Sequence, residues 1–236
     1  MSDNINISPE YNTESHSEYA YRIIRNNIME FKLLPGTQLN EADLANALNI
    51  SRTPIHEAVN RLKEDKFVDV VPRKESKVSY INISLVNEGI FMRCAIEPQI
   101  IKLVAGNMPL EYVKKIQDNL DLQKQILDEK NEIHKFYPVD DEFHKLIYQA
   151  ANKSSIYTSV QKVVGHFDRL RHIIPYDGGY DIESYSYKEH KELFSILMFG
   201  LTKDIDVDMF IQKHIMRFQN NMPIIVEKYS DYFSFA

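Results

Sequence analysis

Cysteine and glycine are scarce in this chain of 236 residues. The single cysteine, Cys94, excludes a disulfide framework and a zinc site built from cysteines, and it indicates a reducing compartment. The seven glycines favour long helices over a β-rich fold with many tight turns. No apolar run is long enough to span a membrane, and the polar residues 1–16 lack the basic and apolar regions of a secretion signal. We therefore expect a cytoplasmic protein with no membrane partner.

The charge of the chain is unevenly distributed. The formal net charge is −6 at pH 7, but residues 17–80 carry ten Lys or Arg against nine Asp or Glu, whereas residues 81–236 carry eighteen against twenty-two. Within the first region the basic residues concentrate late, at Arg52, Arg61, Lys63, Lys66, Arg73, Lys74 and Lys77. An acidic chain with a locally basic surface is compatible with DNA binding, because only that surface meets phosphates.

The first region has the pattern of a winged helix-turn-helix. Apolar residues at helical spacing predict a helix that begins at Ser17 and ends before Pro35. Asn40 can cap a second helix and Ser51 a third, with the turn-forming Asn49 between them. Two β-rich stretches follow, at residues 67–71 and 77–81, and predict a two-stranded wing. We assign this domain to residues 17–81 and a disordered tail to residues 1–16.

The remaining chain, residues 84–236, is predicted to be helical nearly throughout. Helical stretches are expected near 84–106, 109–126, 131–151, 154–173, 183–201 and 204–229. No internal repeat and no sustained heptad pattern is present, so an antiparallel helical bundle is the expected arrangement. The predicted fold class is therefore mainly α, with the winged helix-turn-helix preceding an all-helical domain.

The third predicted helix carries candidate DNA contacts on its polar face. Arg52, Thr53 and His56 lie on its first two turns, where a recognition helix reaches base edges in the major groove. An Arg at this point can bind guanine through two hydrogen bonds. Arg73 and Lys74 at the wing tip would contact phosphates or a minor groove, and Ser51 at the helix cap is a further candidate for DNA binding. An isolated helix with these residues is more often a solvated surface, but the order of two capped helices and a wing favours DNA binding.

Candidate metal ligands are found in the helical domain. Asp140 and His144 are spaced i,i+4 and share one helical face, and His190 and His214 are flanked by apolar residues that indicate an inward orientation. Together they could bind Zn²⁺ or another divalent transition metal. Such an Asp/His pair is more often a surface hydrogen bond, and a His on an apolar face is more often a core residue. His166 could also replace one of the four.

A second pair in this domain is Arg93 and Glu97, again spaced i,i+4. The pattern is compatible with an intrahelical ion pair that has little effect on stability.

Residues 34–78, LPGTQLNEADLANALNISRTPIHEAVNRLKEDKFVDVVPRKESKV, resemble the DNA-binding domain of the GntR family of bacterial regulators. The run from Ser51 to Pro54, followed by Glu57 and Ala58, is the most specific part of this resemblance. His56 stands where the family usually has an Arg that contacts DNA. Lys66 and Glu75 stand where the family commonly has Gly. These departures affect the expected operator sequence and wing geometry.

Residues 84–229 are similar to the FCD effector domain of the FadR-like branch of that family. The Asp-x-x-Phe-His motif of these domains occurs here as residues 140–144, and His190 and His214 match the later ligands. The resemblance implies a bound metal, with Arg93 facing the effector pocket. It further implies a homodimeric regulator, most often a repressor, that binds a palindromic operator and responds to a small organic acid.

Two other functions are compatible with parts of the sequence. One is a metal-dependent hydrolase with three His ligands, although no recognised hydrolase motif such as His-Glu-x-x-His is present and the winged helix-turn-helix would have no role. The other is an interaction module that has lost specific DNA binding, which the residues at positions 56, 66 and 75 would explain. The regulator accounts for both halves of the chain, and we expect no enzymatic activity.

Overall fold

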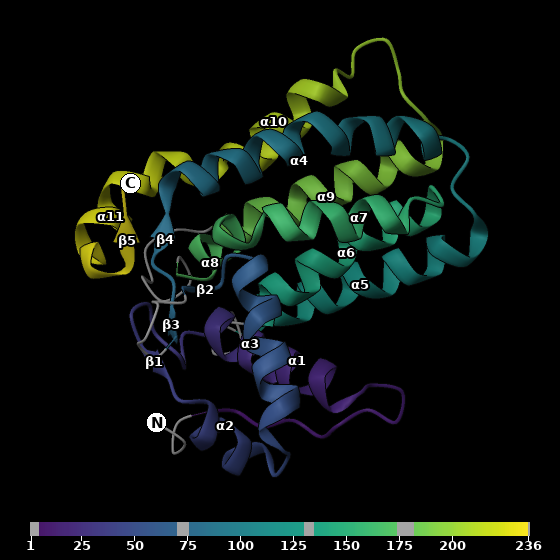
Figure 1. The fold of residues 1–236 in the computed structure, drawn as a ribbon. Helices are drawn as coiled ribbons and strands as arrows, with labels where there is room; N and C mark the ends of the chain where they lie inside the picture. Colours follow the sequence, from purple (N-terminus) through teal and green to yellow (C-terminus); the bar gives the residue numbers. More distant parts are fainter. Residues whose placement is uncertain (1–4, 70–75, 130–134, 174–181, 236) are drawn as a thin grey trace. The chain divides into compact units, whose positions relative to one another are not determined.

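The computed structural model describes residues 5–69, 76–129, 135–173 and 182–235. The chain divides into two compact units, which are considered separately. The first unit contains Met1–Val86 together with Gly165–Leu170 and Val226–Ala236, and the second contains Asn87–Val164 and Arg171–Ile225. Two segments expected in the helical domain are thus part of the first unit. The predicted fold class, a winged helix-turn-helix and a helical domain, is confirmed (Figure 1).

Three helices form the core of the first unit: α1 (His16–Met29), α2 (Glu41–Leu48) and α3 (Arg52–Glu64). Helix α1 begins with a capping box of Ser15 and Glu18. Asn40 caps α2 by accepting hydrogen bonds from two backbone N–H groups, and Asn49 ends it in the left-handed conformation, as the sequence predicts. The apolar face of α1 packs against that of α3 and buries residues including Ile24, Ile28, Ile55, Val59 and Leu62.

A small sheet follows the helices. Strands β1 (Gln38–Leu39), β2 (Val68–Asp69) and β3 (Ser76–Val78) pair antiparallel in the order β1-β3-β2. The wing was expected to have two strands; β1, which precedes α2, adds a third. It was missed because two residues are too few to show an alternating pattern. Residues 70–75 lie outside the described part of the chain.

A second, two-stranded sheet in this unit joins residues that are far apart in sequence. Strand β4 (Ile81–Asn82) pairs in parallel with β5 (Phe233–Ser234) near the C-terminus. The short 3-10 helix η5 (Ser230–Tyr232) precedes β5 and places Tyr232 in a stacked contact with Phe31. The C-terminal residues therefore belong to the unit that carries the helix-turn-helix.

The segment before α1 differs from the expected disordered tail. The backbone N–H of Asn6 donates to the side chain of Asn27, and Arg22 donates to Ser8, to the Pro9 carbonyl and to Glu14. Residues 5–15 thus lie along α1, held by polar side chains that a composition rich in Ser, Asn and Glu does not reveal.

The second unit is helical and resembles the expected bundle. Its helices are α4 (Ile83–Val104), α5 (Leu110–Asp128), α6 (Phe136–Ala150), α7 (Ser154–Val163), α9 (Ile182–Phe199) and α10 (Val207–Met216), with η4 (Arg217–Asn221) after α10. Helix α5 packs against α6 and α9, and α6 against α7 (Figure 1).

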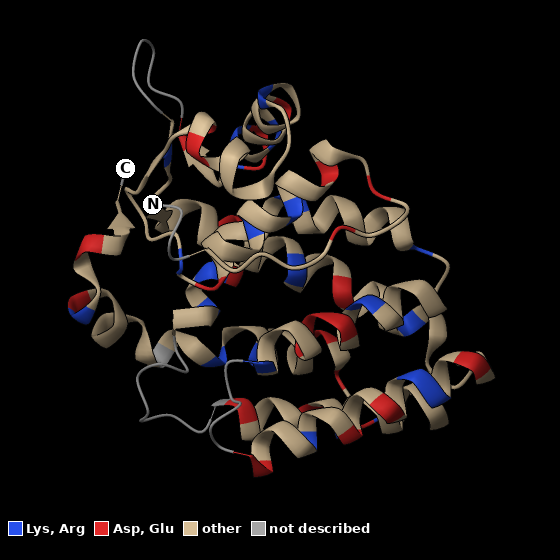
Figure 2. Ribbon diagram, turned by 90° about the horizontal axis from the view of Figure 1, so that it is seen from below, with Lys and Arg blue, Asp and Glu red and all other residues tan. Residues whose placement is uncertain are grey.

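Two predicted helices are each divided in the structure. The stretch 154–173 forms α7 and then α8 (Gly165–Ile173), whose first residues belong to the first unit. The stretch 204–229 forms α10, η4 and α11 (Met222–Lys228). Lys and Arg are interspersed with Asp and Glu along the helices (Figure 2). Among the described residues, no helix is both long enough and apolar enough to cross a membrane.

Candidate DNA-reading helix and metal centre

The polar face of α3 carries exposed residues at its N-terminal end. Arg52, Thr53 and His56 are exposed, whereas Ile55 and Val59 on the opposite face are buried against the core of the first unit. Burial of one face holds the helix in place and leaves the side chains of the other face available to DNA.

Two candidate contacts behave differently from the expectation. Ser51 stands at the N-cap position of α3 with extended backbone, but its side chain makes no capping hydrogen bond within the described residues. His56 lies 3.1 Å from Glu41 of α2, measured from Nδ1 to Oε1, and its side chain is 62% exposed. Glu41 therefore orients the imidazole of His56, at the position where the family that this domain resembles usually has an Arg.

The turn after α3 shows why Gly is common in the family at the position of Lys66. Lys66 adopts a φ of 64°, a left-handed conformation in which Gly is favoured because it has no Cβ. The backbone N–H of Lys66 donates to Lys63 and that of Phe67 to Leu62, which closes the C-terminus of the helix. Of the other candidates in this region, Arg73, Lys74 and Glu75 lie outside the described residues, so their contacts remain predictions.

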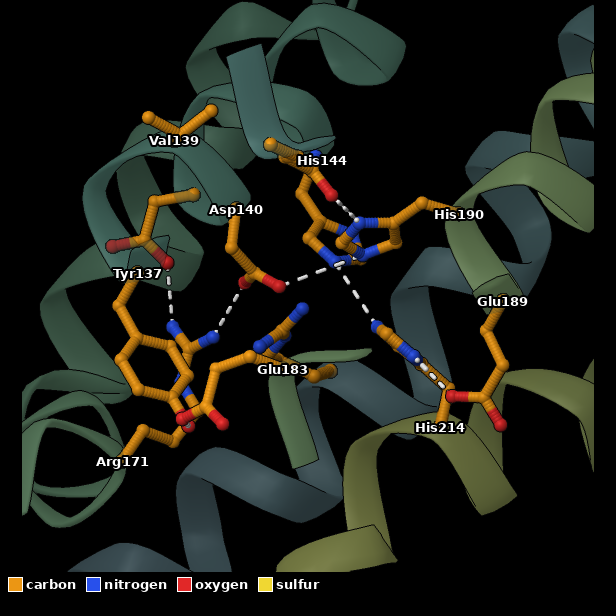
Figure 3. Close-up of polar contacts among 12 residues, drawn as sticks. Tyr137, Val139, Asp140, His144, Arg171, Glu183, Glu189, His190 and His214 are labelled. Atoms are coloured by element: carbon orange, nitrogen blue, oxygen red, sulfur yellow. Dashed lines mark hydrogen bonds and ion pairs between the residues drawn. The ribbon is translucent and has the colours of Figure 1, made fainter. Parts of the chain in front are cut away.

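The four candidate metal ligands converge in the second unit. Asp140 and His144 come from α6, His190 from α9 and His214 from α10, and each offers a ligand atom within 4.8 Å of the others. All four residues are buried. Figure 3 shows their side chains pointing toward one another, two from α6 and one each from α9 and α10. The i,i+4 spacing on α6 and the apolar flanks of the two later histidines therefore identified residues that meet in space.

A hydrogen-bond acceptor orients each imidazole of the cluster. Nδ1 of His144 lies 3.2 Å from Glu97, Nδ1 of His190 lies 2.9 Å from the Gln123 side-chain oxygen, and Nδ1 of His214 lies 2.9 Å from Glu189. A carboxylate or an amide oxygen can only accept, so each Nδ1 donates and each Nε2 carries a lone pair. The three lone pairs face the centre of the cluster. Gln123 and Glu189 have no sequence motif that could have identified them.

The arrangement of these lone pairs fits a cation. Nε2 of His144 and Nε2 of His214 are 3.3 Å apart, and Nε2 of His190 has no hydrogen-bond partner among the described residues. Burial lowers the pKa of all three histidines, that of His214 to about 4, so they are neutral near pH 7. Neutral imidazoles whose second nitrogen donates to an oxygen are the usual form of histidine ligands to zinc.

Arginines compensate the carboxylates that surround the cluster. Burial alone would raise the pKa of Asp140, but Arg171 and then the histidines outweigh it and hold that pKa well below its usual range. Arg171 donates to Asp140 Oδ2 at 2.6 Å and to Asp141, which leaves Oδ1 of Asp140 toward the cluster, 3.5 Å from His190 Nε2. In the same way Arg217 donates to Glu189.

His166, the alternative ligand, lies in the first unit and is not part of this cluster. Its Nδ1 accepts from the backbone N–H of Asn82 at 3.1 Å, and its Nε2 donates to the Lys66 carbonyl at 3.0 Å. Both nitrogens of His166 are therefore occupied by backbone groups, and its role is structural.

Arg93 and Glu97 form the ion pair that their spacing predicts, and the pair is buried. Nε of Arg93 donates to Glu97 at 2.5 Å, and Glu97 in turn contacts His144. Both residues line a small cavity of about 10 Å³ together with Asp141, His144, Tyr148, Tyr157, Val160 and Gln161. The cavity lies beside the metal cluster and has room for about one water molecule.

Protein-family models match both parts of the chain. The model described as "Bacterial regulatory proteins, gntR family" matches residues 16–78, and that described as "FCD domain" matches residues 88–197. The first match contains the helix-turn-helix with α3. The second contains Arg93, Asp140, His144 and His190, whereas His214 lies beyond it.

Curated relatives and solved structures agree with these matches. The HTH-type transcriptional repressor RspR of Escherichia coli (strain K12) is 28% identical over 228 residues, covering 94% of this chain and 95% of that protein. The Nta operon transcriptional regulator of Aminobacter aminovorans is 23% identical over 191 residues, covering 80% of this chain and 86% of that protein. The structure of E. coli McbR/YncC matches with a TM-score of 0.73 at 19% identity, covering 92% of this chain and 100% of that one. The two curated relatives are named as transcriptional regulators, in agreement with the two family matches.

Proposed function

Because the chain belongs to the GntR family of bacterial HTH-type transcriptional regulators, with an FCD domain, we propose that it represses transcription from a palindromic operator. Its affinity for the operator is controlled by a small organic acid bound in the second unit beside a metal ion. RspR, which aligns with this chain over 95% of its own length, is named a repressor, and this supports repression over activation.

The DNA-binding part of the proposal is supported by the exposed N-terminal end of α3. Arg52 and Thr53 are held on the solvent side by the buried residues behind them. Arg52 can bind guanine through two hydrogen bonds, and Thr53 can donate to a base or a phosphate. Ser51 at the helix N-terminus and Arg73 and Lys74 after β2 supply further phosphate contacts.

The metal is supported by one observation above the others: three neutral imidazoles direct their Nε2 lone pairs at one point beside Asp140. A divalent transition metal, zinc in our proposal, would be held by His144, His190, His214 and Asp140 Oδ1. When bound, such an ion supplies a Lewis-acidic position at which an oxygen ligand can coordinate.

An anionic effector is supported by the charges around the site. Glu97, Asp140 and Glu189 are each paired with an arginine: Arg93, Arg171 and Arg217 respectively. These three pairs are neutral together, so a divalent cation would add a positive charge that the partly exposed Asp141 offsets in part. Because a buried uncompensated charge is costly, the occupied site favours an anion, and an organic acid has the required charge.

A homodimer is supported by exposed apolar side chains of the second unit: Leu103, Leu110, Phe199, Leu201 and Met209. A second copy that covers such side chains would remove apolar surface from water. Two copies would present two recognition helices to the two half-sites of a palindrome.

Effector binding controls the operator affinity only if the effector binds two arrangements of the protein with different affinity. In this proposal Asp140, His144, His190 and His214 tie α6, α9 and α10 together, while Arg93 and Glu97 bring α4 to the same site. An effector that enters the cavity changes the packing of these helices, and the arrangement it favours is the one with the lower operator affinity.

The proposal can be tested by selecting bound sequences from a random DNA pool and measuring operator affinity with Arg52→Ala and Arg61→Ala. Arg61 is the matched control because it lies on the same helix with its guanidinium over the Tyr21 ring, 4.0 Å from the centroid. We expect a palindromic site, and a loss of about tenfold to a hundredfold in affinity for Arg52→Ala but little change for Arg61→Ala. Enrichment of no sequence, or equal effects of the two variants, would contradict the proposed DNA recognition.

A further inference from the structure

Tyr148 has a hydroxyl group that the fold does not use. The residue lies on α6 one helical turn after His144, and its side chain is 2% exposed. Its hydroxyl oxygen has no hydrogen-bond partner among the residues that the structure describes. An unsatisfied buried hydroxyl costs about 1–3 kcal/mol, so a Phe at this position would give a more stable protein with the same ring packing.

Tyr148 belongs to the lining of the small cavity beside the four candidate metal ligands. Tyr148 lines this cavity with Arg93, Glu97 and His144. Burial raises the pKa of Tyr148 well above its ordinary value, with Glu97 adding to the effect, so the group keeps its proton and can donate a hydrogen bond. The cavity thus combines an unused donor with an arginine and with one of the metal ligands.

A second tyrosine in the same cavity provides a contrast. Tyr157 of α7 packs edge-on against Tyr148 with ring centroids 5.4 Å apart, and both residues line the cavity. The hydroxyl of Tyr157 donates to the backbone carbonyl of Asp141 at 3.3 Å. The Tyr157 hydroxyl therefore has a partner within the fold, whereas the Tyr148 hydroxyl is available to bind a ligand.

We propose that the Tyr148 hydroxyl determines effector specificity by donating a hydrogen bond to a carboxylate oxygen of a small monocarboxylate. The inference rests on the proposed function and names the class of effector that its sensor site takes. One carboxylate can accept from Tyr148 while it lies next to Arg93 and the metal cluster. A second carboxylate is disfavoured because the carboxylates of Glu97 and Asp141 line the same cavity. The cavity of about 10 Å³ has room for about one water molecule, so a carboxylate enters only when the surrounding helices move apart, and a small ligand requires the least movement.

The experiment compares the full-length, zinc-loaded protein with its Tyr148→Phe and Tyr157→Phe variants. Acetate, glycolate and pyruvate are titrated into each protein by calorimetry, with succinate and inorganic phosphate as ligands of other classes. The unfolding midpoint of each protein is measured without ligand.

We expect at least one monocarboxylate to bind the unmodified protein and to lose about tenfold or more in affinity with Tyr148→Phe. Tyr157→Phe should retain affinity within about twofold, because its hydroxyl bonds to the backbone instead of the ligand. The effects on stability without ligand should be opposite to those on affinity. Tyr148→Phe should unfold at the same temperature as the unmodified protein or higher, and Tyr157→Phe should unfold at a lower temperature than the unmodified protein. A purely structural Tyr148 would not produce this reversal.

The inference is overturned if Tyr148→Phe binds the monocarboxylates as tightly as the unmodified protein does. It is also overturned if only succinate or phosphate binds, or if none of the probes binds. Zinc content and operator affinity are measured on the same samples. A protein that binds zinc and its operator but fails these titrations refutes the role of Tyr148 alone, whereas absence of zinc or of operator binding refutes the proposed function.

Discussion

The imidazole of His166 is held in one tautomer by hydrogen bonds to two backbone groups. It is neutral, with the proton on Nε2, and the ring lies between the turn at Lys66 and the strand at Asn82. Burial, and then the nearby positive charge of Arg169, lower its pKa to about 4, although the Lys66 carbonyl acts in the opposite direction. Protonation would place a charge on a largely buried side chain and would remove the acceptor for Asn82.

This pKa predicts how the stability depends on pH. Between pH 6.5 and 4 the unfolded chain takes up a proton at His166 and the folded chain does not, so the free energy of unfolding falls as the pH falls through this window. A shift of this size corresponds to about 3 kcal/mol. His166→Gln keeps a donor and an acceptor but does not titrate. Denaturant unfolding of the zinc-free protein from pH 7.5 to 4 should give a shallower pH dependence for His166→Gln than for the unmodified protein, and identical profiles would contradict this assignment.

Strand β5 joins the C-terminal residues to the first unit by pairing with β4. Phe233 in β5 is 7% exposed and lies opposite Ile81, whereas Phe235, two residues later, is 71% exposed. Phe233→Ala should therefore lower the free energy of unfolding by about 3 kcal/mol through loss of buried apolar surface. Phe235→Ala removes the same atoms from an exposed position and should change stability by less than about 0.5 kcal/mol. Chemical denaturation of the two variants provides the measurement, and equal effects would show that β5 does not pack as described.

At the scale of the whole molecule, the metal cluster should contribute to stability because it joins residues of three helices. A ligand that binds only the folded state at 100 times its dissociation constant adds about 2.7 kcal/mol. Chelation of the metal should therefore lower the unfolding temperature of the unmodified protein. The unfolding temperature of His190→Ala, which lacks the fully buried ligand on α9, should respond much less to the chelator. Differential scanning calorimetry with and without the chelator tests this, and an equal response of both proteins would place the metal elsewhere.

Patterns within a few consecutive turns determined much of this protein from sequence alone. The caps at Asn40 and Asn49, the apolar face of α3 and the pair at Asp140 and His144 depend on neighbours close in sequence, so spacing was enough to predict them. The apolar residues around His190 and His214 indicated that both face inward, and the resemblance to known families supported them as ligands. Lys66 stood out as a departure from a family Gly, and its left-handed backbone gives the physical reason for that preference.

Only the tertiary structure decided which groups complete the sites. Gln123 and Glu189 orient two imidazoles of the cluster, and Arg171 pairs with Asp140, through contacts across 67, 25 and 31 residues of sequence. The β4–β5 pairing and the unpartnered hydroxyl of Tyr148 also depend on residues that are distant in sequence. Hydrogen bonds and burial act through space over a few ångströms, whereas periodicity and capping act along the chain. The sequence therefore determined the elements and the candidate ligands, and the packing of the helices determined their partners.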